Sequence, residues 1–227
     1  MIGAGMMARA FARLRTRRSV VVCASGVSNP LETDPTQFER ERQVLEEVRK
    51  AHPGALLLYF GTCSVYDPDR IDTPYVQHKL RMEALLAESQ GGYLVLRLPL
   101  VIGPSERAKT LPSFLHARIR NGESFEVWSR AMRYPIDVDD ALRVAARFVD
   151  EPAMINRRIN VALRAYRVMD FVRIMERIVG REARVGLIDK GGSYEVSCPE
   201  LQELDAELQL DRSEQYLERV LRKYFAG

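Results

Sequence analysis

The sequence predicts an α/β fold, a doubly wound parallel sheet with a small C-terminal lobe. Two observations support this prediction. Short, continuous apolar runs occur at 19–25, 55–61 and 92–98, and such runs are typical of parallel strands that helices cover on both faces. Helical patterns separate the runs, so strand and helix alternate along the chain. This alternation implies right-handed crossovers within one sheet.

The helices that follow the first two of these runs begin in the same way. Asp34 precedes Pro35, and Thr73 precedes Pro74. A side-chain oxygen just before a helix accepts a free N–H group, and proline suits the first helical position. The sequence therefore predicts helices that start at residues 35 and 74.

The pattern loosens beyond residue 104. We expect a core over residues 1–104, with returning elements near 133–161, and a substrate-binding lobe over 105–227. The lobe should pack against the carboxyl ends of the strands, where such sheets place ligands. Within it we expect helices near 111–121, 138–149, 167–179 and 213–225 and short strands near 125–128 and 157–161.

The composition is that of a folded domain. The 227-residue chain is 46% hydrophobic and 29% charged, which argues against general disorder. Its 34 basic and 31 acidic residues are spread along the chain, so nothing indicates nucleic acid binding. Its apolar runs are too short or too interrupted to span a bilayer, and no signal-peptide pattern opens the chain. We therefore expect a cytoplasmic protein without membrane contact.

The three cysteines do not indicate a metal site. Cys23, Cys63 and Cys198 lie far apart, and they form neither a CxxC pair nor metal-ligand spacing with the histidines. We expect reduced thiols, two of them at buried strand ends. Cys63 is not expected to act as a nucleophile, because the sequence places no base beside it.

Tyr75 and Lys79 are candidates for proton transfer. They are four residues apart in a predicted helix, so their side chains share one face. A nearby ammonium lowers the pKa of a phenol, and such a tyrosine could exchange a proton with a sugar hydroxyl or carbonyl. Thr62, at the carboxyl end of the preceding strand, could hold the same oxygen. The same spacing also occurs by chance, and Tyr75 would then be a half-buried helix anchor.

The first residues form a second candidate motif. The segment GAGMMA at 3–8 is a GxGxxA turn that opens a helix, where glycines let the backbone approach a pyrophosphate. The alternative interpretation is a small-residue turn that packs a helix on a sheet.

Four segments, in this order, resemble the extended short-chain dehydrogenase/reductase superfamily and its NAD-dependent epimerase/dehydratase family. They are IGAGMMA, FGTCSVYD with PYVQHK, LRLPLVIGP, and RYPIDVDDALRVAARFV. The resemblance extends from residue 1 to about 180. It implies a Rossmann-like fold, NAD or NADP as cofactor, and a nucleotide-sugar substrate.

The resemblance also implies roles for individual residues. Tyr75 matches the acid/base tyrosine, Lys79 the lysine that binds the nicotinamide ribose, and Thr62 the catalytic hydroxyl position. The cofactor-binding residues that it implies are Gly3, Gly5, Met6, Met7, Ala24, Ser25, Gly26, Tyr75, Lys79 and Pro99. The substrate-binding residues that it implies are Cys63, Ser64, Leu100 and Arg133.

Two of these positions have simpler interpretations. Arg133 matches the arginine that holds the nucleotide-sugar diphosphate, but it could be a solvated loop charge. Thr62 could bond only to the backbone at its strand end. Asp139 matches the family's aspartate that opens the next helix, and we expect it to act as a cap.

The chain departs from the family in its first half. The run at 19–25 follows the first helix directly, so two strands of the family's sheet have no counterpart. The acidic residue that grips the adenosine ribose belongs to the end of one of them, and no Asp or Glu precedes Glu32. The basic residues in this gap could meet a 2′-phosphate or form a solvated helix end; they are Arg13, Arg15, Arg17 and Arg18.

Further departures concern the first strand and the substrate. Only Met1 and Ile2 precede Gly3, which would leave the run at 19–25 as an exposed edge. We expect the native start to lie upstream, or another segment to cover this edge. Leu100 replaces the family's asparagine, and the segment from Thr62 to Tyr75 is short.

The leading hypothesis is an NAD(P)-dependent reductase or epimerase that acts on a nucleotide-activated keto-sugar for surface polysaccharide synthesis. Tyr75 would move the proton. The rival hypothesis is a non-catalytic, degenerate Rossmann protein that binds a nucleotide sugar or a protein partner. A homodimer is expected, because this family commonly pairs through the helix that bears Tyr75 and its neighbour.

Overall fold

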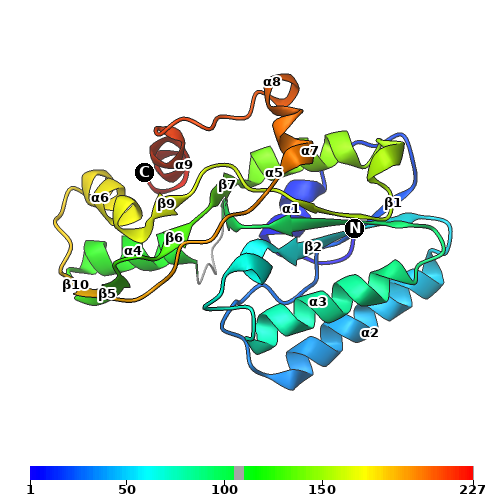
Figure 1. Ribbon diagram of the computed structural model, residues 1–227, viewed down its shortest axis with the longest axis horizontal. Helices are drawn as coiled ribbons and strands as arrows, with labels where there is room; N and C mark the ends of the chain where they lie inside the picture. Colours follow the sequence, from blue (N-terminus) through cyan, green and yellow to red (C-terminus); the bar gives the residue numbers. More distant parts are fainter. Residues whose placement is uncertain (105–109, 227) are drawn as a thin grey trace.

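The computed structural model of the protein describes residues 1–104 and 110–226 (Figure 1). At its centre lies a parallel sheet built from the predicted apolar runs and one returning strand. In order across the sheet, the strands are β1 (Val20–Cys23), β2 (Leu56–Thr62), β3 (Tyr93–Leu98) and β8 (Arg157–Asn160). The predicted α/β fold with a parallel sheet is confirmed.

Helices cover both faces of this sheet (Figure 1). The two on one face, α2 and α3, run side by side, and α1 and α5 belong to the other face. Asp34 accepts a hydrogen bond from the Thr36 N–H, and Thr73 accepts one from the Val76 N–H, so both predicted caps are present. The helices are α1 (Met6–Phe11), α2 (Pro35–Ala51), α3 (Pro74–Ala87) and α5 (Val138–Phe148).

The strands alternate their side chains between two apolar cores, as the two-residue period of a strand requires. The core on the α2 and α3 side includes Val21, Leu57, Val95, Leu45 and Leu86. The core on the α1 and α5 side includes Val22, Leu58, Leu94, Phe11 and Phe148.

The edge beyond β1 carries one further residue. Ile2 forms a single parallel bridge with Cys23, so the residues before the glycine turn lie beside β1 at this edge. The side chains of Val21, Val22 and Cys23 are nevertheless buried, because α1 and α2 cover the two faces of the strand. The strand at this edge therefore does not expose these apolar side chains.

The C-terminal half, here the C-terminal lobe, carries short strands and helices and returns β8 to the central sheet. The predicted helices and strands of this half are all present within a few residues, and several short elements were not predicted. Its elements are β4 (Leu100–Ile102), α4 (Leu111–Asn121), β5 (Phe125–Trp128), β6 (Met132–Arg133), β7 (Pro135–Asp137), η2 (Pro152–Met154), β9 (Tyr166–Arg167), α6 (Val168–Val179), β10 (Val185–Ile188), α7 (Pro199–Gln202), α8 (Asp205–Leu208) and α9 (Tyr216–Phe225). The division of the chain near residue 104 stays a prediction.

Helix α9 is anchored to the start of α5, and this anchoring corrects one expectation. The cap of α5 is Asp137, whose side chain accepts the Asp139 N–H. Asp139 instead accepts hydrogen bonds from Lys223 of α9 and Arg13, so its role as a cap was predicted wrongly. Asp137 is one residue earlier than the first helical residue, which is where an oxygen can reach the free N–H groups.

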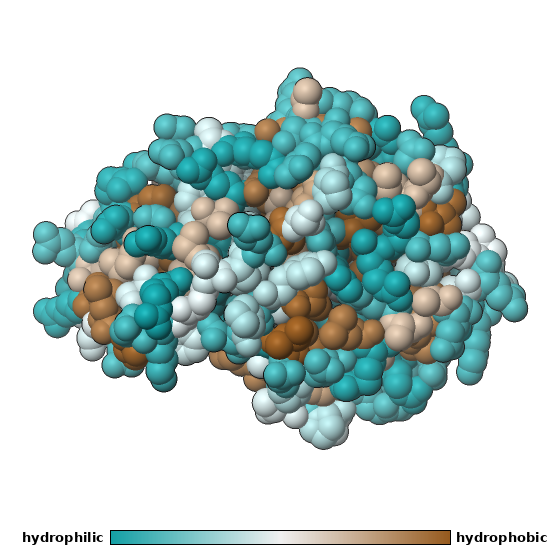
Figure 2. Space-filling model, viewed as in Figure 1, coloured by the Kyte–Doolittle hydropathy of each residue, from teal (hydrophilic) through white to brown (hydrophobic). Residues whose placement is uncertain are grey.

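The surface shows no single large apolar face in the view of Figure 2. Hydrophilic side chains dominate its outline, and hydrophobic ones gather in separate patches. Within the described residues, no helix is long and apolar enough to cross a membrane.

Candidate functional site

A cavity of about 920 Å³ lies between the carboxyl ends of β1, β2 and β3 and the C-terminal lobe. Every site residue predicted from the sequence lines it. The lining includes Gly3, Gly5, Met6, Met7, Ala24, Ser25, Gly26, Thr62, Cys63, Ser64, Tyr75, Lys79, Pro99, Leu100 and Arg133. The structure thus brings the whole set together around one space, and their individual roles stay predictions.

The glycine turn lies at one part of the cavity wall. Gly3 has a φ of +122°, which favours glycine, and a Cβ there would lie 2.4 Å from the Ala24 carbonyl oxygen. Gly5 precedes α1 and has no neighbour within 4 Å of its would-be Cβ. The first glycine therefore serves the packing of the turn against the end of β1, and the second leaves its backbone open.

The proposed acid/base residues share a second part of the wall. Tyr75 and Lys79 lie on successive turns of α3, and the Lys79 Nζ is 6.0 Å from the centre of the Tyr75 ring. Thr62 ends β2, and its Oγ1 accepts the Ser64 N–H at 3.1 Å, which is the backbone bond foreseen as its simpler interpretation. The Thr62 hydroxyl hydrogen is still available to a ligand, because an acceptor oxygen can also donate.

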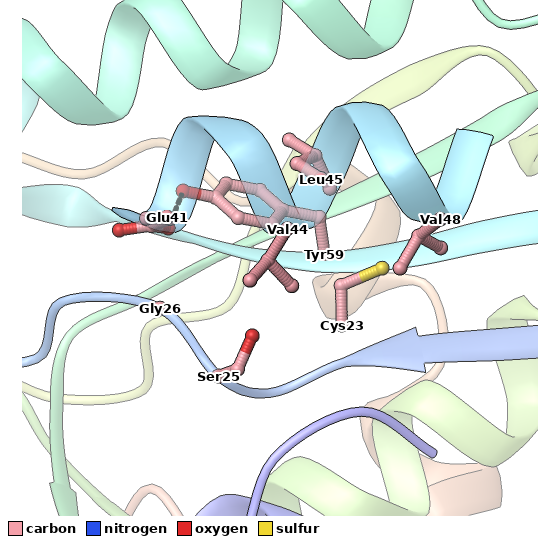
Figure 3. Close-up of a pocket in the computed structure, with 8 residues that line it drawn as sticks. All are labelled: Cys23, Ser25, Gly26, Glu41, Val44, Leu45, Val48 and Tyr59. Carbon is pink, nitrogen blue, oxygen red and sulfur yellow. Dashed lines mark hydrogen bonds between the residues drawn. The ribbon is translucent and has the colours of Figure 1, made fainter. Parts of the chain in front are cut away.

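Behind Lys79 lies a buried carboxylate that the sequence analysis did not single out. Glu41 of α2 accepts hydrogen bonds from the Tyr59 hydroxyl at 2.6 Å, shown in Figure 3, and from Lys79 Nζ at 3.0 Å. It also accepts from the Val27 N–H and from His78 Nε2. Burial alone would raise the pKa of Glu41, but the Lys79 charge and these hydrogen bonds hold it well below its usual value.

A cationic region lies elsewhere in the cavity lining. Arg133 Nη1 and Arg70 Nε lie 4.0 Å and 3.6 Å from the same oxygen of Asp67. The two guanidinium groups therefore share one carboxylate. Burial and the charge of Arg70 lower the pKa of Arg133. Tyr194 lines the same cavity, and burial raises its pKa to about 12. The two guanidinium groups line the cavity, and such groups suit an anionic ligand.

The remaining predicted substrate residues differ in character. Cys63 is buried, its Sγ donates to the Arg97 carbonyl at 3.0 Å, and burial raises the pKa of its thiol. That environment is unsuited to a nucleophile, as expected. Leu100 offers only apolar contact. All three cysteines are buried and free, and no metal-binding cluster occurs within residues 1–104 and 110–226.

The residues fit NAD or NADP only in part. The open glycine turn and Lys79 suit the pyrophosphate and the nicotinamide ribose. The carboxylate that usually holds the adenosine ribose has no counterpart in the described cavity. The acidic residues that line this cavity are Asp67 and Glu126, and neither belongs to the glycine turn or to the segment after β1. The four arginines of the gap do not line the cavity either; Arg13 instead bonds Asp139. Arg40, by contrast, lines the cavity, and its Nη2 donates to the Ser25 carbonyl oxygen at 3.4 Å.

A sequence signal for Glu41 existed. The helix predicted to start at residue 35 has Phe38, Leu45 and Val48 along one side, and Glu41 falls on that same side at helical spacing. A carboxylate on the buried side of a helix needs a hydrogen-bond or ion-pair partner, and the spacing does not identify that partner. Arg70 and Tyr194 carried no comparable signal, since both lie outside regular helices and strands.

Solved structures with the same fold include sugar-nucleotide enzymes. UDP-glucuronic acid 4-epimerase from Bacillus cereus, in complex with UDP-glucuronic acid and NAD, is 17% identical with a TM-score of 0.72, over 97% of this chain and 77% of that one. UDP-glucose 4-epimerase from Thermus thermophilus, in complex with NAD, is 16% identical with a TM-score of 0.71, over 97% and 81%. RMD from Pseudomonas aeruginosa, complexed with NADPH, is 19% identical with a TM-score of 0.67, over 92% and 80%. These similarities confirm the Rossmann-like fold.

A search of curated proteins finds no match to the chain. The model of the NAD dependent epimerase/dehydratase family matches residues 8–162, which contain Thr62 at the end of β2, the Tyr75 and Lys79 pair, and Arg133. This match spans more than half of the chain and contains three of the four segments that suggested the resemblance; the glycine turn at 3–5 precedes it. The chain therefore belongs to the NAD dependent epimerase/dehydratase family.

Proposed function

We propose that this protein is an NAD(P)-dependent reductase or epimerase that acts on a nucleotide-activated keto-sugar. The observation that supports this most is the convergence of Thr62, Tyr75 and Lys79 with the glycine turn on one cavity. The epimerases of similar fold are described with UDP-sugars and NAD, which points to the same class of ligands. NAD or NADP, when bound, would supply the hydride acceptor or donor.

In this proposal, the chain's own residues bind and orient the sugar and move one proton. The Tyr75 hydroxyl exchanges a proton with the sugar oxygen, and the Thr62 hydroxyl donates a hydrogen bond to the same oxygen. Lys79 uses an N–H group to hold the nicotinamide ribose. Pro99 and the segment Ala24–Gly26, which line the cavity, are proposed to contact the cofactor, and Cys63, Ser64 and Leu100, which also line it, the substrate.

Arg133 and Arg70 bind the diphosphate of the nucleotide sugar in this proposal. Both guanidinium groups line the cavity and lie 3.6 Å and 4.0 Å from one oxygen of Asp67. A guanidinium offers two parallel N–H groups that match a phosphate, and a partly buried site strengthens such bonds. Arg133 was predicted from the resemblance; Arg70 is added by the structure.

A direct experiment is to titrate the protein with NADH and NADPH by fluorescence, and separately with UDP by calorimetry. Turnover is then assayed with a panel of UDP-linked sugars and 4-keto-sugars. Binding of a dinucleotide and a nucleotide, with interconversion of at least one sugar, would support the proposal.

The missing adenosine-ribose carboxylate favours a second candidate, a non-catalytic protein that binds a nucleotide sugar or a protein partner. In that case UDP binds while neither NADH nor NADPH does, and no sugar is converted. The same titrations therefore separate the two candidates.

We also propose a cytoplasmic homodimer, paired through α3 and its neighbour α2, that serves polysaccharide synthesis. Sedimentation equilibrium would test the dimer, and a charge introduced at Ala84, exposed on α3, should weaken it. A monomer at all concentrations would contradict this part alone.

A further inference from the structure

Glu41 lies directly behind the lysine of the proposed active site. We propose that Glu41 is a positioning residue for the cofactor: its carboxylate holds the Lys79 ammonium at the cavity wall and leaves one N–H group for the ligand. This inference rests on the proposed function, since it assigns Lys79 to a bound dinucleotide.

The Glu41 carboxylate is fully engaged. Its side chain is 3% exposed, and each oxygen accepts two hydrogen bonds. Oε1 accepts from Tyr59 and Lys79, at 2.6 Å and 3.0 Å, and Oε2 accepts from Val27 and His78, at 2.7 Å and 2.9 Å. The His78 ring also stacks on Phe38, with 4.7 Å between ring centres, which fixes its orientation. The carboxylate thus has a single position, set by α3, β2 and the loop after β1.

All four partners present a donor to Glu41, which explains why the position carries an acid. The His78 contact requires the tautomer, or the charged form, that bears a hydrogen on Nε2. A glutamine would place an NH₂ group opposite two of these donors and lose their hydrogen bonds. An ionised carboxylate is the side chain of this length that accepts from all four partners.

Lys79 is held through two of its three N–H groups. Its Nζ lies 3.0 Å from Glu41 Oε1 and 3.0 Å from the Tyr59 hydroxyl oxygen. Among the described residues no third acceptor bonds to it, although Lys79 lines the cavity. An ammonium carries three donors, so one remains for a hydroxyl or phosphate oxygen in the cavity.

The backbone above Lys79 depends on the same arrangement. A Cβ on Gly26 would lie 2.4 Å from Glu41 Oε1 and 2.9 Å from Lys79 Nζ. Gly26 therefore lets the segment after β1 close over the ion pair, and that segment lines the cavity where the cofactor is proposed to bind. The side chain of Lys79 is 5% exposed, so without Glu41 its charge would lie in a poorly solvated site with only a phenol as partner.

A double-mutant cycle tests whether Glu41 acts through Lys79. Glu41→Gln and Lys79→Met are made singly and together, and NADH and NADPH affinities are measured by fluorescence titration. We expect Glu41→Gln to weaken dinucleotide binding about tenfold in the parent chain and to cause no further loss beside Lys79→Met. Glu39→Gln, an exposed change on the same helix, is the matched control and should leave affinity unchanged.

Equal losses in the two backgrounds would show that Glu41 supports the fold near the cavity and does not act through Lys79. That outcome would overturn the proposal, because a positioning effect must vanish when the positioned group is absent.

A second measurement needs no cofactor. The ligand-free protein is treated with an N-hydroxysuccinimide ester, and acylation of each lysine is followed by peptide mass spectrometry. Because Lys79 is 5% exposed and held by Glu41, we expect it to react slowly in the parent and at least about threefold faster in Glu41→Gln, with Lys190 unchanged as internal control. An unchanged Lys79 rate would overturn the proposal.

The two measurements separate this inference from the proposed function. If the parent binds neither NADH nor NADPH, the proposed function fails, while acylation still reports whether Glu41 holds Lys79. If Glu41→Gln does not fold, Tyr59→Phe replaces it. This variant keeps the carboxylate, so Lys79 should remain slow; rapid acylation there would show that the tyrosine holds the lysine and would reject the role of Glu41.

Discussion

Lys79 and Tyr75 face each other across one turn of α3, with the Lys79 Nζ 6.0 Å from the centre of the Tyr75 ring. Both side chains are buried in the wall of the same cavity, and Thr62 reaches that cavity from the end of β2. The arrangement brings a phenol, a cation and a hydroxyl to one space. It is the basis of the first prediction.

Replacing Tyr75 by phenylalanine should reduce turnover by about 10²- to 10⁴-fold, because proton transfer by a positioned side chain contributes that much. The fold and the affinity for UDP should be preserved, since only a hydroxyl is removed. Steady-state kinetics with the converted sugar measures this. Tyr93→Phe is the control, as Tyr93 is also buried but does not line the cavity. Equal turnover in Tyr75→Phe and the parent would refute the acid/base role.

Replacing Arg70 or Arg133 by methionine should weaken UDP binding about 10- to 100-fold, because a hydrogen bond to a charged group contributes about 1.5–3 kcal/mol. Isothermal calorimetry measures the affinity, and raised salt should reduce the difference from the parent. Arg164→Met serves as control, since Arg164 pairs with Glu214 at the surface. If the two cavity variants bind UDP as the parent does, the anionic group of the ligand lies elsewhere.

The sequence predicts the central sheet well because its signals are local. The apolar runs at 19–25, 55–61 and 92–98 and the caps Asp34 and Thr73 are local features that depend on few contacts with the rest of the chain. The short strands β4, β6, β7, β9 and β10 were not predicted. Each is two to four residues long, and its strand conformation depends on a partner distant in the sequence.

In the site, too, residues in local motifs could be predicted, whereas contacts between distant segments could not. Tyr75, Lys79 and Thr62 stand in recognisable motifs, so their meeting at one cavity could be predicted. Glu41 could not be assigned a partner, because 38 positions separate it from Lys79 and only the packing of α2 on α3 brings them together. The cap of α5 was misassigned to Asp139, since Asp137, Asp139 and Asp140 all lie near the start of that helix.

Glu83 should be important for stability. It is 1% exposed on α3, and it accepts three hydrogen bonds from Arg97 of β3, at 3.0 Å, 3.2 Å and 2.6 Å. Glu83→Gln should cost about 3 kcal/mol of unfolding free energy, because the partly buried guanidinium of Arg97 would lose its counter-ion. Urea denaturation followed by circular dichroism measures it. Glu39→Gln breaks an exposed pair and should change little, so equal effects would contradict the prediction.

Glu41 should also give the protein part of its acid sensitivity. Its folded-state pKa lies below that of an unfolded glutamate, so at acidic pH the folded state binds fewer protons than the unfolded state does. The stability that the ionised carboxylate contributes is therefore complete above about pH 4.5 and is lost progressively below it. Urea denaturation at several pH values between 7 and 3 measures this loss.

Glu41→Gln should be less stable than the parent at pH 7, and the difference between the two should shrink as the pH falls below about 4.5. The glutamine cannot be protonated in this range, so that part of the parent's pH dependence disappears in the variant. Asp34→Asn is a suitable comparison, because Asp34 also has a lowered pKa but lies at the exposed start of α2, where solvent weakens the effect. A difference between Glu41→Gln and the parent that stays constant from pH 7 to pH 3 would show that the carboxylate's charge does not stabilise the fold.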